Sequence, residues 1–477
     1  MSVYPRNLSS FLNRLSGYNK NNVKLNVLGS SSARDGDIIQ VELPTNSIVD
    51  LSSLAWAFEV VYADPAGNNA DLPLHAEALI SRLAVEVNGQ TLVNLTNYNT
   101  LFHAIYNLSA TEDFQRQRQV SQTNTQDGVA PGSCKRLAAG NTETRQHVID
   151  SWLGFLGTAK PNFIDTALLG NVRITITLAG ANITNGDNGG IVRGYTIRDS
   201  QHFSIDVVSI NDGVYDSMVD SLIGAGGVIE VPFKNYFHFS SQQDSMNQTT
   251  AFTVASQSID KLWAVPRRQT YANADAAQVG IAGKARSTSG AAVGGGVAGA
   301  AHAIAVAGGG AAGDNGVGAI TAEVQAFNHP HMNFESCNGT NFQFKINNTL
   351  YPSWQSQMPG EWLALSKLAI GDQGNMLSGS MIESLKQFED NFFTFVVSLE
   401  HKTDGDERFV SGIDTRGAAA QCYFTSTQST VAGDVVTGVA GGAAINRTVA
   451  VANQVNVFAE CTSLLRIMAG KTIEIVQ

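Results

Sequence analysis

Apolar and polar residues alternate along much of the chain, most clearly between Ala78 and Ser109. Every second position from Leu83 to Val87 is apolar, which predicts a strand with one buried face. Asn88-Gly89 follows directly, and both residues tolerate the positive φ of a type I′ turn, so residues 92–95 are expected to return as the second strand of a hairpin. Apolar residues at helical spacing between Leu101 and Tyr106 then predict a helix packed on the sheet.

The same alternation predicts further strands on both sides of this hairpin. Residues 38–43 and 54–61 precede it, and residues 172–178 alternate strictly before at least one more strand within 195–210. The polar stretch 108–141 is typical of a long surface loop. The first half of the chain is therefore predicted to be an antiparallel β domain.

A Gly-rich stretch, 211–227, separates this domain from a second series of strands. The strands expected there are 228–239, 251–265, 341–346, 392–399, 455–459, 464–468 and 471–476, with helices at 362–370 and 381–388. Because residues 228–265 repeat the pattern of residues 38–61, a second domain of the same kind is expected. We predict an N-terminal domain at 35–212 and a C-terminal domain at 213–477.

Residues 279–319 interrupt the second domain with thirteen Gly and thirteen Ala among 41 positions. These residues offer too little side-chain area to form a core. The segment is predicted to be a surface loop between strands.

The size and charge of the chain restrict the classes of function. A chain of 477 residues exceeds what one hydrophobic core usually supports, so two cores are expected. Hydrophobic residues make up 43% and charged residues only 15%, and weakly charged surfaces suit burial against neighbouring subunits. The formal net charge of −11 argues against a module that binds nucleic acid directly.

The cysteines and the N-terminus indicate where the chain folds. Cys134, Cys337, Cys422 and Cys461 show neither the CxxC spacing of zinc sites nor the density of a disulfide scaffold, which fits a reducing compartment. Residues 1–18 lack the apolar core of a signal peptide, and no later window approaches the ~20 apolar residues of a membrane helix. Synthesis and folding in a cytoplasm are expected.

The N-terminal segment 1–34 is basic although the whole protein is acidic, and it contains no Asp or Glu. Apolar residues at helical spacing between Leu8 and Leu15 predict a short amphipathic helix. This segment either packs on its own domain or frays, or it is an arm that reaches an anionic membrane, a nucleic acid or a neighbouring subunit. The residues expected to form such an arm are Arg6, Phe11, Arg14, Lys20 and Lys24.

Every match to a catalytic or cofactor motif has a simpler explanation. Residues 294–299 satisfy GxGxxG but lie in the Gly/Ala tract without a preceding strand. Residues 470–472 resemble the end of a phosphate-binding loop, yet only five residues follow them. His329 and His331 flank a proline in a loop, and the acidic turn 404–407 could hold Ca²⁺ at a subunit contact but is typical of a solvated hairpin tip. No catalytic, cofactor or metal residue is assigned, and the protein is not expected to be an enzyme.

Two all-β domains with long loops and inserted helices suggest two jelly rolls. Four stretches carry a resemblance to a known family: ALISRLAVEVNGQTLVNLTNYNTLF, VIEVPFKNYFHF, FTVASQSIDKLWAV and LYPSWQSQMPGEWLALSKLAI. From about residue 35 to 477 the chain resembles the double jelly-roll major capsid proteins of tailless icosahedral double-stranded DNA viruses. These include tailless membrane-containing phages, virophages, polinton-like viruses and nucleocytoplasmic large DNA viruses.

The resemblance implies two tandem antiparallel eight-stranded jelly rolls with short helices in the connecting loops. It implies a homotrimer whose six jelly rolls form a pseudo-hexagonal capsomer of the virion shell, assembled in the host cytoplasm or a viral factory. The expected partners are neighbouring capsomers, penton and minor capsid proteins, and the N-terminal arm could reach an internal membrane. Sequence-specific nucleic-acid binding and cofactors are not expected.

Two alternative functions are kept. The first is a carbohydrate-binding or glycan-processing protein built on tandem β-sandwiches, which would need a cleft lined by exposed aromatic residues and carboxylates. Trp354 and Trp362 flank a loop that could serve, although Pro352 and Pro359 fit a packed corner better. The second alternative is a minor capsid or spike protein.

Overall fold

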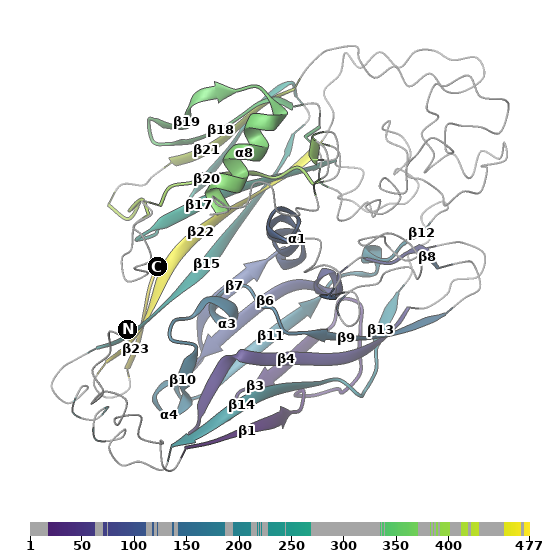
Figure 1. Ribbon diagram of the computed structural model, residues 1–477, viewed down its shortest axis with the longest axis vertical. Coiled ribbons are helices and arrows are strands. Elements are labelled where there is room, and N and C mark those ends of the chain that lie inside the picture. Colours follow the sequence, from purple (N-terminus) through teal and green to yellow (C-terminus); the bar gives the residue numbers. More distant parts are fainter. Residues whose placement is uncertain are drawn as a thin grey trace, which may run out of the picture.

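The computed structural model contains two antiparallel β-sandwiches that follow each other along the chain (Figure 1). The described residues are 18–62, 70–73, 75–110, 142–186, 194–210, 228–243, 245–268, 339–370, 392–400, 412–417, 421–428, 453–468 and 472–477, with isolated positions between them.

The first sandwich has two large sheets, with the strand orders β1-β14-β4-β13-β2 and β3-β11-β6-β7. Strands β9 and β10 extend the first of these sheets by pairing with β4, and β12-β5-β8 form a small third sheet. The strands are β1 (Tyr18–Leu25), β2 (Ala33–Arg34), β3 (Ile38–Glu42), β4 (Ile48–Tyr62), β5 (Ala70–Asp71), β6 (Ile80–Val87), β7 (Gln90–Thr96), β8 (Arg136–Leu137), β9 (Glu143–Ile149), β10 (Phe163–Asp165), β11 (Val172–Leu178), β12 (Asn185–Gly186), β13 (Tyr195–Ile197) and β14 (His202–Ile210). The helices are η2 (Ala76–Leu79), α1 (Tyr98–Ser109), α3 (Phe155–Thr158), α4 (Thr166–Leu169) and η3 (Ala181–Ile183).

The second sandwich has the sheets β15-β22-β17-β20 and β16-β21-β18-β19, and β23 pairs with β22. Its elements are β15 (Ile229–Gln243), β16 (Asn247–Thr253), β17 (Ile259–Arg268), β18 (Gly339–Ile346), β19 (Thr349–Ser356), α8 (Pro359–Ile370), β20 (Phe395–Ser398), β21 (Gln421–Gln428), β22 (Asn453–Met468) and β23 (Thr472–Val476).

Both sandwiches have the same strand order. Numbered one to eight along the chain, the principal strands of each form one sheet in the order 1-8-3-6 and a second in the order 2-7-4-5. In the first sandwich these strands are β1, β3, β4, β6, β7, β9, β11 and β14, and in the second they are β15 to β22. This is the order of a jelly roll, so the predicted all-β fold of two tandem eight-stranded jelly rolls is confirmed.

The hairpin predicted from the alternating pattern is present. Strands β6 and β7 pair antiparallel, and the turn residues Asn88 and Gly89 have φ values of 49° and 79°. Positive φ at both positions is what a type I′ turn requires. The predicted helix lies within α1, which buries most of its residues. Turn chemistry and helical spacing thus specify this part of the fold locally.

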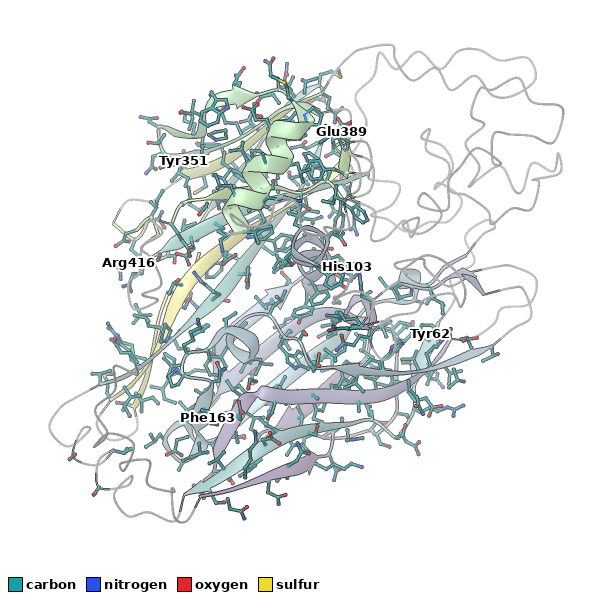
Figure 2. All side chains as sticks on the ribbon, in the orientation of Figure 1. Tyr62, His103, Phe163, Tyr351, Glu389 and Arg416 are labelled. Atoms are coloured by element: carbon teal, nitrogen blue, oxygen red, sulfur yellow. The ribbon has the colours of Figure 1, made fainter. Side chains whose placement is uncertain are left out.

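Large apolar side chains fill both sandwiches (Figure 2). In the first, Trp56 is fully buried, with its ring centroid 4.1 Å from that of Phe58 and 5.6 Å from that of Phe203. In the second, the ring of Phe342 lies among four other aromatic rings, those of Trp362, Phe393, Phe395 and Phe424. Each jelly roll therefore contains its own group of packed aromatic rings, although the buried apolar residues of the two form one continuous cluster.

The domain limits differ from the prediction at the N-terminus. Strands β1 and β2 lie within the segment 1–34, which was expected to form an arm, and both belong to the sheet that contains β4 and β14. Most of β1 is exposed, so its sequence, YNKNNVKL, lacks an alternating pattern. The expected boundary at 212/213 falls between the end of β14 and the start of β15. The Gly/Ala tract 279–319 lies outside the described residues.

Candidate functional site

The two jelly rolls contact each other along a surface that we call the seam. It is formed by β7, α1 and α3 of the first jelly roll and by β15 and α8 of the second. Figure 1 shows β7 and β15 lying next to each other where the two sandwiches meet. Because β7 and β15 are both edge strands of their sheets, the seam joins an edge of one jelly roll to an edge of the other.

Helix α3 anchors the seam through a pair of aromatic rings and two backbone contacts. The rings of Phe155 and Phe233 are buried and perpendicular, with centroids 5.3 Å apart, an arrangement that aromatic pairs favour. The backbone N–H of Lys160 donates to the carbonyl of Pro232 at 3.0 Å, and the backbone N–H of Lys234 donates to Thr158 Oγ1 at 2.9 Å. These contacts fix β15 against the first jelly roll.

Gly157 allows α3 to make its tight turn. A Cβ atom at this position would lie 1.7 Å from the backbone oxygen of Trp152, so no other residue fits without a shift of the backbone. The indole of Trp152 in turn donates to the carbonyl of Leu54 on β4 at 2.8 Å. The position of α3 is therefore determined by contacts within the first jelly roll.

His238 on β15 links both jelly rolls through hydrogen-bonding groups. Its Nδ1 lies 3.3 Å from Thr96 Oγ1, and its Nε2 lies 3.1 Å from both Asn97 Nδ2 and Asn456 Oδ1. Burial lowers the pKa of this imidazole below its ordinary value, although the Asn456 contact opposes the effect. A neutral ring donates at one nitrogen and accepts at the other, so Nε2 can bond only one of its two amide neighbours at a time, whereas the Thr96 hydroxyl at Nδ1 suits either tautomer.

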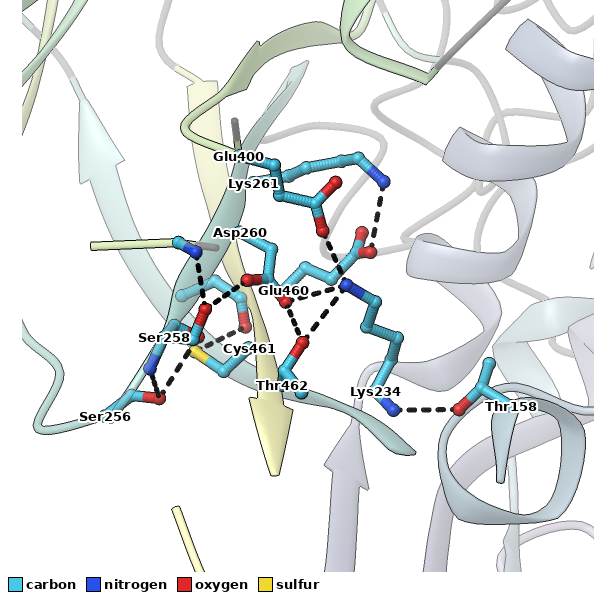
Figure 3. A network of polar contacts seen from close by, with 12 residues as sticks. Thr158, Lys234, Ser256, Ser258, Asp260, Lys261, Glu400, Glu460, Cys461 and Thr462 are labelled. Carbon is cyan, nitrogen blue, oxygen red and sulfur yellow. Dashed lines mark hydrogen bonds and ion pairs between the residues drawn. The ribbon is translucent and has the colours of Figure 1, made fainter. Parts of the chain in front are cut away.

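A network of charged side chains lies directly behind the seam (Figure 3). Lys234 Nζ donates to Asp260 Oδ2 at 2.8 Å, to Glu400 Oε1 at 2.6 Å and to Thr462 Oγ1 at 3.2 Å. Asp260 is buried and also accepts hydrogen bonds from the hydroxyls of Ser258 and Thr462, each at 2.5 Å. The network thus connects β15, β17 and β22 with Glu400, which lies shortly after the end of β20.

A second ion pair continues this network on β17 and β22. Lys261 Nζ lies 3.2 Å from Glu460 Oε1, and the indole of Trp263 donates to Glu460 Oε2 at 3.1 Å. Burial alone would lower the pKa of Lys234, but the carboxylates of Asp260 and Glu460 raise it above the ordinary value. Lys234 is therefore a permanent cation that compensates carboxylates which would be costly to bury alone.

A buried pair of histidines joins α1, which contains His103, to His75 at the start of η2 on the first jelly roll's side of the seam. The ring centroids of His75 and His103 are 4.9 Å apart, and His103 Nδ1 lies 2.8 Å from the carbonyl of Asn99. Neither ring nitrogen of His75 has a hydrogen-bond partner among the described residues. Arg118 lies over the ring of Tyr106 and forms an ion pair with Glu77.

Because of these histidines, we expect the first jelly roll to become less stable in acid. Burial lowers the pKa of His103 to about 4 and that of His75 well below its ordinary value, and the charge of Arg118 acts in the same direction. Between about pH 6.5 and 4 the unfolded chain therefore binds more protons than the folded protein, so stability falls as the pH falls. We expect each histidine to contribute up to about 1.4 kcal/mol per pH unit to this loss.

The variant His75→Phe tests this expectation, because it keeps an aromatic ring against Tyr106. Urea unfolding at pH 7, 6 and 5 should give a flatter dependence of the unfolding free energy on pH for this variant than for the unmodified protein. Glu77, whose pKa is raised by burial, is present in both proteins and affects both curves alike. Identical slopes for the two proteins would contradict the assignment.

The residues predicted to form the N-terminal arm are only partly described. Lys20 and Lys24 lie on β1, where Lys20 Nζ is 2.7 Å from Asp206 Oδ2 and 3.7 Å from Asp50 Oδ2. The hydrogen bond from Lys20 lowers the pKa of Asp206. These two lysines are therefore part of the first jelly roll's edge. Arg6, Phe11 and Arg14 lie outside the described residues.

The motifs set aside as chance matches do not form a site among the described residues. Residues 294–299, His329, His331 and the turn 404–407 lie outside them, and Thr472 begins β23. In the described part of the chain, no group of His, Cys, Asp and Glu residues could hold a metal ion. Within the same residues, no helix has both the length and the apolar character needed to span a membrane.

The two tryptophans considered for a sugar-binding cleft do not share one surface. Trp362 is buried, with its ring 4.9 Å from that of Phe342 and its indole donating to the carbonyl of Ser356 at 3.0 Å. Trp354 on β19 is exposed, and its indole donates to Glu361 Oε1 at 2.8 Å. Between them Gln355, Gln357 and Met358 are exposed, so the packed corner expected from the prolines is limited to the surroundings of Trp362.

Sequence reasoning did not identify the seam. Phe155 and Phe233 are 78 positions apart along the chain, and Lys234 and Glu400 are 166 positions apart. The one local signal was Lys234 itself, a cation within the mostly apolar and aromatic strand VIEVPFKNYFHF. A partly buried lysine favours an anionic partner, but its position along the chain does not reveal which one.

Comparisons with known proteins show which solved structures share this fold. No protein-family model and no curated protein sequence matches the chain. Among solved structures, it is similar to PBCV-1 VP54 fitted into a reconstruction of the virophage Sputnik, with a TM-score of 0.60, 12% identity and coverage of 100% of this chain and 99% of that one. A quasi-atomic model of the PBCV-1 virus capsid gives a TM-score of 0.58, 14% identity and coverage of 100% and 99%. The Faustovirus major capsid protein gives a TM-score of 0.52 and 9% identity, with coverage of 94% of this chain and 90% of that one. The chain therefore shares the double jelly-roll fold of viral capsid proteins over essentially its whole length.

Proposed function

We propose that the chain is a viral major capsid protein that forms the icosahedral shell around a genome. The observation that carries this proposal is the repetition of one jelly roll, with one strand order, in two copies joined edge to edge at the seam. The similarity to capsid proteins over both jelly rolls supports the same conclusion. The glycan-binding alternative has less support, since its two candidate tryptophans do not line a common cleft.

The proposed assembly unit is a homotrimer. Three chains bring together six jelly rolls. Because the jelly rolls are alike in fold and size, six of them can form a ring with a hexagonal outline. Such a ring fills a surface with few gaps, which is the requirement for a shell built from many copies. The small share of charged residues suits this role, because each charge buried between subunits would need a partner.

The remaining proposals concern partners and place of assembly. The basic segment before β1 would face the inside of the shell, where it would contact an internal membrane or a minor capsid protein. Penton proteins would occupy the vertices. Synthesis and assembly would take place in the host cytoplasm or a viral factory.

Light scattering of the purified protein tests the proposed trimer. We expect a stable species with three times the 50.6 kDa mass of one chain. A monomer of 50.6 kDa that persists at high concentration would contradict the proposal.

A further inference from the structure

Among the described strands, the internal repeat leaves the counterparts of the two seam edges without a neighbour in the same chain. The seam joins the edge strand β7 of the first jelly roll to the edge strand β15 of the second. The counterpart of β7 in the second jelly roll is β19, and the counterpart of β15 in the first is β1. Among the described strands, β19 pairs only with β18 and β1 pairs only with β14. Figure 1 shows β19 and β1 at opposite ends of the molecule.

The strand registers support this correspondence residue by residue. In each jelly roll a tryptophan on the third principal strand pairs with a phenylalanine on the eighth, and this phenylalanine pairs with a residue of the first strand. On β4, β14 and β1 these residues are Trp56, Phe203 and Leu25. On β17, β22 and β15 they are Trp263, Phe458 and His238. Leu25 therefore occupies the position of His238, which contacts β7 and the residue after it within the chain. The helices α1 and α8, each of 12 residues, also follow the equivalent strands β7 and β19.

The β19 edge exposes apolar side chains, whereas the apolar side chains of β7 are buried. On β7, Leu92 and Val93 are each 1% exposed, whereas on β19 Leu350 is 40% and Trp354 52% exposed. Met358, just after β19, is also exposed. Because the indole N–H of Trp354 is already bonded to Glu361, its ring can be covered without leaving a buried donor unpaired. This edge has the properties of a contact surface that lacks its partner.

The β1 edge also has exposed apolar side chains beside it. Most of β1 is exposed, and Leu28, shortly after its end, is an exposed apolar side chain. Leu28 is held beside β3 by a bridge to Gln40. Ile38, at the start of β3, is exposed as well.

We propose that the β19 edge, with Leu350, Trp354 and Met358, docks on the β1 edge of a second copy of this chain and thereby repeats the seam between chains. This inference rests on the proposed function and specifies which surfaces build the trimer. The contact joins two different surfaces, so it is head-to-tail, and such contacts form a closed ring when the rotation between copies allows it. Three copies then contain six contacts of one kind, three within chains and three between them.

The variant Trp354→Glu tests the proposal by light scattering. A buried tryptophan is a typical hot spot, and its loss should weaken each contact about 30-fold or more, so the trimer should dissociate to 50.6 kDa chains. Phe163→Glu is the matched control, because Phe163 is equally exposed but lies on β10, which pairs with β4. The control should remain a trimer. Cooperative thermal unfolding of the monomeric Trp354→Glu variant would show that it still folds.

Mixing two variants tests the head-to-tail geometry. Trp354→Glu blocks the β19 edge and Leu28→Glu blocks the β1 edge, so each alone should be monomeric. Together they retain one intact contact and should give, after cross-linking, a mixed dimer with twice the 50.6 kDa mass of one chain. If neither variant leaves the trimeric state, the assigned surfaces are wrong although the proposed trimer stands. If both variants are monomers but form no mixed dimer, the contact is not head-to-tail. If the unmodified protein is itself a monomer, the proposed function fails.

Discussion

Phe342→Ala should lower the free energy of unfolding by about 4 kcal/mol, because it empties the centre of the second jelly roll. The ring of Phe342 is buried, with its centroid 4.7 Å from that of Phe393 and 4.9 Å from that of Trp362. Removing it leaves a cavity whose aromatic walls cannot close fully, so the lost contacts add to the lost burial of the ring. Urea unfolding followed by tryptophan fluorescence measures the change.

Phe163→Ala serves as the control for this prediction, because Phe163 is half exposed at the periphery of the first jelly roll (Figure 2). Its removal should change the unfolding free energy by less than about 1 kcal/mol. Both variants should be compared at one protein concentration, since assembly makes the apparent stability depend on concentration. A loss below about 1 kcal/mol for Phe342→Ala would contradict the described core.

Lys234→Met should be the second most damaging change, with a loss of about 3–5 kcal/mol. The substitution keeps the apolar stem but removes the cation that Asp260 and Glu400 share. Asp260 is almost fully buried and would keep its hydroxyl donors but lose its counter-charge. Because the pKa of Lys234 is raised in the folded protein, its contribution is fully present at neutral pH and disappears only in strong base.

Arg416→Met provides the matched control, since Arg416 also pairs with an aspartate but does so at the surface. Arg416 Nη2 lies 2.8 Å from Asp414 Oδ2, and about half of each side chain is exposed. Exposed pairs of this kind contribute little to stability, because water and salt screen their attraction. Urea unfolding at pH 7 should therefore separate the two variants by about 2 kcal/mol or more. Equal losses would show that the network behind the seam does not stabilise the fold.

The parts of the fold that could be predicted from sequence are those specified by neighbouring residues. The β6–β7 hairpin follows from Asn88-Gly89 and the alternation before it. Strand β11 alternates between buried and partly exposed positions over its whole length, because one face lies on the core and the other faces out. Local patterns of this kind need no knowledge of distant residues.

The parts that could not be predicted depend on surroundings that the sequence does not display. Strand β1 is polar because most of its residues face out, so it resembled an arm. Strand β22 runs unbroken from Asn453 to Met468 and is buried over most of its length, so its pattern does not alternate and it was interpreted as two shorter strands. The seam joins Phe155 to Phe233 across the domain boundary, and such a pairing follows only from the folded chain.

The central claim is that one chain supplies two equivalent lobes of a six-lobed ring, and electron microscopy of the purified oligomer tests it most directly. Averaged views down the symmetry axis should show six lobes of similar size in a hexagonal outline, with three-fold symmetry. A two-lobed or open-ended particle would contradict the account, because it would mean that the free β1 and β19 edges do not close a ring of three chains.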